Sequence, residues 1–135
     1  MKVILQRKNN AYHFQGTGKN PVPIHIDNGE NGASPMELLL MSVGGCSAVD
    51  IVSILKKQRQ EITTYTIEVE GERHEVAQAK PFKAVHVAIF LEGSIVPAKA
   101  KKAAQLSFQK YCSVSLTLEP QVPVTYTVYV NGEKI

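Results

Sequence analysis

Apolar and polar residues alternate along three short stretches near the start of the chain, which is the pattern of half-buried strands. The first stretch covers residues 3–8, and the Asn9-Asn10 pair after it predicts a tight hairpin turn with positive φ values. A second strand is predicted to begin at Tyr12 and a third to cover 22–26. Three strands are therefore expected before the first helix.

The strongest helix signal begins at residue 34. Ser34 can cap the helix, Pro35 suits its first position, and Glu37 can close a capping box with Ser34. The helix is predicted to run to about Gln60.

This helix is apolar nearly all round, as a helix buried on every side is. Its apolar stretch, 36–55, is long enough to be tested as a membrane span, but a carboxylate near its middle would be costly in lipid. We therefore predict a buried helix and no membrane association. The Gly44-Gly45 pair costs about 1 kcal/mol per residue relative to Ala, which suggests that another backbone approaches closely there.

The rest of the chain predicts two strands, a helix and a last strand. The strands are expected over 64–70 and 82–91, the helix from Pro97 to 111, and the last strand over 122–130. This order predicts an α+β fold with a mostly antiparallel sheet, in a single domain over 1–135. Six short strands and one amphipathic helix cover one side of the long helix, so a second copy of the chain is expected to cover the rest in a homodimer.

Composition excludes several classes of function. The net charge of +3 is mild, the basic residues are scattered and there is no Trp, so no nucleic-acid partner is expected. The start, MKVILQRKNN, has three consecutive apolar residues, too few for a signal-peptide core, and a cytoplasmic protein is predicted. Two cysteines are too few for a disulfide scaffold or a metal cage, and no metal or cofactor is expected.

The candidate chemistry lies at the two cysteines. Cys46 is within the long helix and Cys112 directly follows the second one. Most buried thiols are inert packing, and that interpretation stays open for both.

Three motifs nevertheless resemble a known family: SPMELLL over 34–40, GGCSAVDI over 44–51 and YCSVS over 111–115. Together they resemble the OsmC and organic hydroperoxide resistance (Ohr) superfamily, and within it the YhfA-like branch. The resemblance implies an intertwined homodimer in which a mostly antiparallel sheet wraps two central helices, with sites at the subunit interface.

The resemblance also implies a thiol peroxidase with two catalytic cysteines. Cys46 would attack the O–O bond of a hydroperoxide and become a sulfenic acid. Cys112 would condense with it to a disulfide, which a dithiol reductant reopens.

In the peroxidase branches an Arg-Glu pair activates the thiol, with the Glu directly after the helix-start Pro. Here Met36 occupies that position and Glu37 follows it. Nine residues of helix put Glu37 about 13–14 Å from Cys46 and on the opposite face. Capping, or a role in the partner subunit's site, is therefore the expected task of Glu37.

Three more residues are candidate activators. Asp50 follows Cys46 by one helical turn, but a carboxylate alone raises a thiol pKa, so Asp50 either holds a cation or pairs structurally. Arg7 and Arg73 are each in phase with apolar residues of their strands, and each either serves the site or forms a structural pair.

The leading hypothesis is an enzyme that reduces organic hydroperoxides in defence against oxidative stress. The alternative is a non-catalytic module of the same fold, which binds a small apolar or thiol-reactive ligand at the dimer cleft. A third hypothesis is an interaction protein whose thiols serve packing alone.

Overall fold

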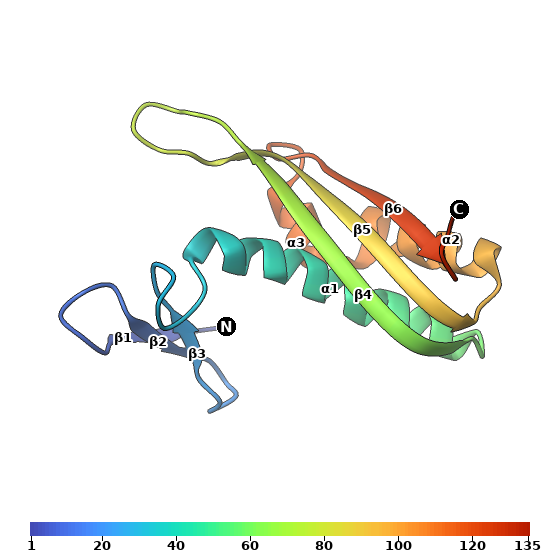
Figure 1. Cartoon of the computed structure of the whole chain (residues 1–135), viewed down its shortest axis with the longest axis horizontal. Helices are drawn as coiled ribbons and strands as arrows, with labels where there is room; N and C mark the ends of the chain where they lie inside the picture. The colour runs from blue at the N-terminus through green and yellow to red at the C-terminus, as the bar shows by residue number, and fades with distance from the viewer. The chain divides into compact units, whose positions relative to one another are not determined.

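The computed structural model describes residues 1–135 in two compact units, Met1–Leu39 and Leu40–Ile135. The fold is α+β, and the predicted order of strands and helices is confirmed, with short additions in the last third of the chain (Figure 1). The elements are β1 (Ile4–Arg7), β2 (Phe14–Thr17), β3 (Ile24–Ile26), α1 (Pro35–Lys57), β4 (Glu61–Arg73), β5 (Phe82–Ser94), α2 (Pro97–Leu106), the π-helical segment η1 (Ser107–Tyr111), α3 (Ser113–Leu118), β6 (Val124–Val130) and β7 (Glu133–Lys134).

In the N-terminal unit, β1, β2 and β3 form an antiparallel sheet in that order. The predicted tight turn after β1 is wrong, because neither Asn9 nor Asn10 has a positive φ. The Asn9 side chain organises a wider loop instead: its Oδ1 accepts hydrogen bonds from the amides of Ala11 and His13, at 3.0 and 3.1 Å. The second and third strands each begin slightly later than predicted.

The start of α1 has the predicted capping box. The Ser34 amide donates to Glu37 Oε2 at 2.8 Å, and the Glu37 amide donates to Ser34 Oγ at 3.2 Å. The helix ends at Lys57 rather than near Gln60. Arg59 has a φ of 57°, a left-handed conformation that stops the helix and directs the chain into β4.

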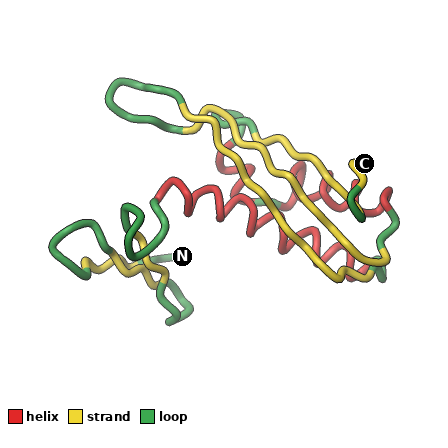
Figure 2. Tube along the Cα trace, in the orientation of Figure 1, coloured by secondary structure: helices red, strands yellow, loops and turns green.

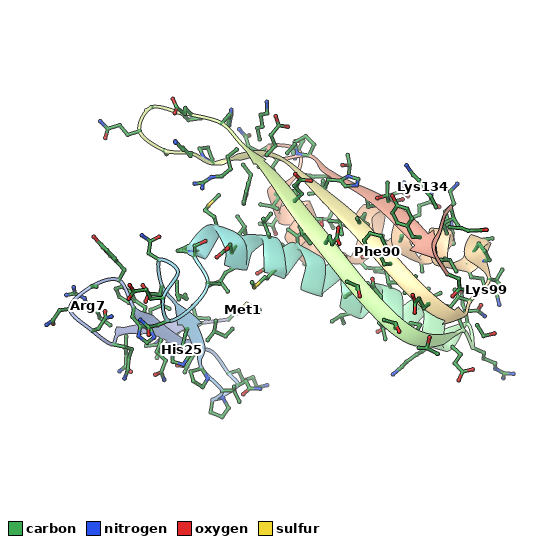
Figure 3. All side chains as sticks on the ribbon, in the orientation of Figure 1. Met1, Arg7, His25, Phe90, Lys99 and Lys134 are labelled. Carbon is green, nitrogen blue, oxygen red and sulfur yellow. The ribbon has the colours of Figure 1, made fainter.

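The sheet of the C-terminal unit has the order β4-β5-β6-β7. It is mostly antiparallel, as predicted, but β5 and β6 are parallel because the helical connection between them crosses back over the sheet. Residues of β5 alternate between its faces: Val87 and Ile89 are buried on the face toward the helices, while Phe90 lies on the opposite face and stacks on Tyr129 (Figure 3). This alternation makes the sheet one wall of the core.

One face of α1 packs on this sheet, and its buried residues follow the helical period: Val43, Gly44, Ser47, Ile51 and Leu55. On another face, the side chains of Met41 and Val49 are 59% and 67% exposed. Within one chain the helix is therefore covered on part of its circumference. By length and composition α1 could cross a membrane, a test that the core helix of a soluble protein also passes.

The connection from β5 to β6 differs from the single helix predicted from Pro97 to residue 111. Regular α2 ends at Leu106, a π-helical segment follows, and α3 begins after Cys112. Figure 2 colours the helices of the chain red and its strands yellow. Ala100 and Ala103 are buried in α2. The wider turn of η1 changes the direction of the chain before Cys112. π-Helical turns occur often at functional sites.

The Gly44-Gly45 pair was expected to face another backbone. Instead, a Cβ at Gly44 would lie 2.9 Å from Val69 Cγ2, a side-chain atom of β4, and a Cβ at Gly45 would meet nothing within 4 Å. Gly44 is therefore required for the close packing of α1 on the sheet.

Gly44→Ala should lower the free energy of unfolding, because overpacking costs about 1–3 kcal/mol and exceeds the gain of about 1 kcal/mol in helix propensity. Urea unfolding of the variant and of wild type measures the difference. The matched control is the same substitution combined with Val69→Ala, which removes the clashing methyl group. An equal loss with and without Val69→Ala would show that this contact does not set the requirement for glycine.

Candidate functional site

Helix α1 supplies the first two groups of the candidate site. Cys46 and Asp50 are four residues apart, so the helical repeat places them on one face, one turn apart. Asp50 is fixed by a residue that is distant in sequence: Ser107 Oγ donates to Asp50 Oδ2 at 2.9 Å. Ser107 is the first residue of η1 and is fully buried. The hydrogen bond thus joins α1 to the connection that leads to Cys112.

Cys112 lies at the break between η1 and α3, where its backbone is extended (φ −71°, ψ 94°). Its amide donates to the Ser107 carbonyl at 2.7 Å, and its carbonyl accepts from the Leu116 amide at 3.0 Å. Its side chain is fully buried. These bonds hold the second sulfur in one place without a regular helix around it.

The two elements bring three ligand-type atoms together. The sulfurs of Cys46 and Cys112 and a carboxylate oxygen of Asp50 all lie within 4.8 Å of one another. Both cysteines are free thiols. Cys46 is half-buried while Cys112 is buried, so Cys46 is the more accessible of the two residues.

The environment of Cys112 favours its protonated form. Burial raises the pKa of the Cys112 thiol above its ordinary value, and a hydrogen bond with Cys46 raises this pKa further. Ser115 opposes these effects, because its hydroxyl, 3.1 Å from the Cys112 sulfur, and its amide both stabilise the thiolate. The net effect keeps the proton on Cys112, next to the sulfur of Cys46.

The other predicted activators bind backbone groups. The Arg7 guanidinium in the N-terminal unit donates to the carbonyls of Asn10 and Ala11, at 2.6 Å and 3.0–3.1 Å (Figure 3). Arg73, at the end of β4, donates from Nε to the Lys80 carbonyl at 2.7 Å. Glu37, also in the N-terminal unit, forms the capping box with Ser34, and these hydrogen bonds lower the pKa of its carboxyl. Of the four candidates, Asp50 is the one that joins the cysteine cluster.

Sequence reasoning missed Ser107 and Ser115, the two hydroxyls that contact the cluster. Both are buried serines in segments that otherwise bury apolar residues. Ser107 also continues the helical period of the buried Ala100 and Ala103. A polar residue in phase with an apolar helix face is the sequence feature that could have indicated a buried polar contact.

A hollow of about 440 Å³ opens beside Asp50 in the C-terminal unit. It lies between the second half of α1 and the end of the α2–η1 connection. Apolar and polar side chains share its lining, with Lys57 as the cationic group and Tyr111 as the aromatic one. The remaining lining residues are Ser53, Ile54, Gln58 and Leu106.

Comparison with known proteins gives consistent matches. Residues 27–127 match the family model described as OsmC-like protein. The protein YhfA of Escherichia coli K12 is 39% identical to this chain over 105 residues, which are 77% of this chain and 78% of YhfA. The crystal structure of a hypothetical protein from Aquifex aeolicus VF5 is 32% identical, with a TM-score of 0.82 over 96% of both chains. The organic hydroperoxide resistance protein OhrB of Bacillus subtilis is 19% identical, with a TM-score of 0.64 over 95% of this chain and 96% of OhrB, a likeness of fold alone.

Proposed function

This chain belongs to the OsmC-like protein family, and we propose from that membership that it reduces organic hydroperoxides with Cys46 and Cys112 in defence against oxidative stress. The observation that carries the proposal is the meeting of the two sulfurs within 4.8 Å, although the residues are far apart in sequence. A solved structure of the same fold is named an organic hydroperoxide resistance protein, which supports the proposed reaction with hydroperoxides.

The proposed reaction divides the work between the two thiols. The Cys46 thiolate attacks the outer oxygen of the hydroperoxide, the O–O bond breaks, and the alkoxide leaves as an alcohol after it takes a proton. Cys46 is then a sulfenic acid. The Cys112 sulfur attacks it, water leaves, and a disulfide forms, which a dithiol reductant reopens by exchange. Cys46 is half-buried, whereas Cys112 is buried and has a raised pKa, which fits Cys46 as the thiol that reacts first.

We further propose that the working unit is a cytoplasmic homodimer in which residues 1–135 act as one domain. The exposed side chains of Met41 and Val49 leave part of the central helix without cover in a single chain. Burying them against a second copy follows from the hydrophobic effect.

A cation that activates Cys46 stays a prediction, with Arg7 and Arg73 as its candidates and Asp50 or Glu37 as their acidic partner. Replacing the activating arginine by Ala should slow alkylation of Cys46 at neutral pH, because a cation close to a thiolate stabilises it. Alkylation is followed by mass spectrometry in the Arg7→Ala, Arg73→Ala and double variants, with Arg59→Ala as the control. Unchanged rates in all of them would remove both arginines from the mechanism.

A peroxide-consumption assay with a dithiol reductant tests the function itself. Wild type should consume an organic hydroperoxide catalytically, and Cys46→Ser should fall to the rate of the reductant alone, because a hydroxyl cannot replace the thiolate nucleophile. Lys56→Gln, which changes an exposed residue in the last turn of the same helix and outside the hollow beside Asp50, is the matched control and should keep wild-type activity. Equal rates for wild type and Cys46→Ser would contradict the proposal.

The hollow beside Asp50 favours a second candidate, a non-catalytic module that binds a small, partly apolar ligand. The same assay separates the two, since a binding module consumes no peroxide.

A further inference from the structure

We propose that the reduced protein binds one Zn²⁺ ion per chain through the sulfurs of Cys46 and Cys112 and the carboxylate of Asp50. This site goes beyond the proposed peroxide chemistry and needs nothing from it. The sequence provides two cysteines, too few ligands for a metal; the fold supplies Asp50 as the third.

The spacing of the donors fits a tetrahedral ion. Zinc bonds of about 2.3 Å to sulfur and 2.0–2.2 Å to oxygen put neighbouring ligand atoms roughly 3.5–3.8 Å apart. The three donor atoms lie within 4.8 Å of one another, so side-chain rotations that shift these atoms by about 1 Å complete the tetrahedral geometry. Cys46 and Asp50 stand at i and i+4 on one helix, the spacing with which helices present paired metal ligands.

Two of the three donors already have the outer hydrogen bonds that orient metal ligands. Ser107 donates to Asp50 Oδ2 at 2.9 Å and leaves the other carboxylate oxygen for an ion. Ser115 donates to the sulfur of Cys112 at 3.1 Å and orients it. Both hydroxyls are buried, and their bonds do not compete with water.

The donor set selects the kind of metal. Two thiolates disfavour Mg²⁺ and Ca²⁺, which take oxygen ligands, whereas Zn²⁺ accepts thiolate and carboxylate together. Three protein ligands leave a fourth position, and the half-buried side of the cluster at Cys46 gives water or a small ligand access to it. A zinc ion there occupies both sulfur nucleophiles, so metal binding and attack by peroxide exclude each other.

Zinc titration of the full-length protein tests the site. The chain is reduced with a phosphine, and Zn²⁺ is titrated against a chromophoric chelator with no peroxide present. One equivalent should bind. Cys46→Ser and Cys112→Ser should lose this binding, Asp50→Asn should weaken it at least tenfold, and Ser107→Ala should weaken it about 10–100-fold. Glu68→Gln, which removes an exposed carboxylate on β4, is the matched control and should bind as wild type does.

Cobalt supplies a second measurement that reports the ligands directly. Co²⁺ in the reduced protein should give the near-ultraviolet thiolate-to-metal absorption and strong visible bands of a tetrahedral site, and both should vanish in the two cysteine variants. Circular dichroism checks that each variant is folded.

A competing metal site lies in the N-terminal unit, where His13 Nε2 and His25 Nδ1 are 2.9 Å apart. Zinc binding that survives both cysteine substitutions but not His13→Ala would overturn the proposal, as would a wild-type protein that binds no zinc. Since every measurement is made without peroxide, the zinc site and the peroxidase fail independently.

Discussion

One equivalent of an organic hydroperoxide should convert the reduced protein into a form with an internal Cys46–Cys112 disulfide, lighter by two hydrogens. The two sulfurs lie within 4.8 Å of each other and need to close to a bond of about 2.05 Å. The sulfenic acid on Cys46 is therefore trapped as soon as Cys112 loses its proton. Intact mass before and after alkylation, and peptide mapping of the crosslink, measure the product.

Removing Cys112 should change the fate of Cys46 rather than its first reaction. In Cys112→Ser the first peroxide should still be consumed, but turnover should then stop, and excess peroxide should drive Cys46 to the irreversible sulfinic and sulfonic acids. Cys112→Ala gives the same test without a polar group in a buried position.

Ser113→Ala, the exposed position next to Cys112, is the control and should turn over as wild type does. Sustained turnover in both Cys112 variants would show that Cys112 does not resolve the intermediate. A Cys46 that oxidises no faster than a free model thiol would favour the packing interpretation for both cysteines.

Local chemistry made much of the fold predictable. Ser34 and Glu37 bond within four residues of sequence, so the capping box could be recognised without any tertiary information. The alternation over 64–70 in β4 shows in the sequence because every second side chain, such as Ile67 and Val69, lies against α1 while the residues between them are exposed.

The region around Cys112 was less predictable, because tertiary contacts decide it. The segment 113–118, SVSLTL, alternates polar and apolar residues as a strand does, yet it forms α3. The π-helical turn before it is held by a bond from the Cys112 amide to the Ser107 carbonyl. Local propensity favours neither feature, and packing against the rest of the unit overrides it.

The candidate site also has parts that the sequence predicts and parts that it does not. The proximity of Cys46 and Asp50 follows from the helical repeat alone, and the pairing of Cys46 with Cys112 followed from the family resemblance. The bond from Ser107 to Asp50 spans 57 residues of sequence and becomes visible once the connection is folded over α1. Pairing across such a distance has no periodic signal.

The exposed face of α1 predicts how the protein assembles. Met41, Gly45 and Val49 recur every four residues and form one stripe, in which Met41 and Val49 are more than half exposed and Gly45 has open space beside it. In a two-fold dimer the same stripe serves both subunits, so each substitution acts twice. Wild type should therefore sediment at twice its 14.8 kDa chain mass at every concentration at which it is folded.

Val49→Asp should dissociate this dimer, because it would bury two like charges against each other with no partner for either. Sedimentation equilibrium across a range of concentrations measures the shift toward 14.8 kDa. Val76→Asp makes the same change at a 50% exposed position in the β4–β5 hairpin and should leave the dimer intact. A Val49→Asp protein that stays dimeric would place the interface elsewhere, and a wild type that is monomeric when folded would remove the homodimer.

The same variant tests whether the site needs the dimer. Cys46 follows Gly45 directly and lies beside the stripe, so a monomeric Val49→Asp protein should also lose peroxide consumption. Full activity in the monomer would show that one chain holds the complete site.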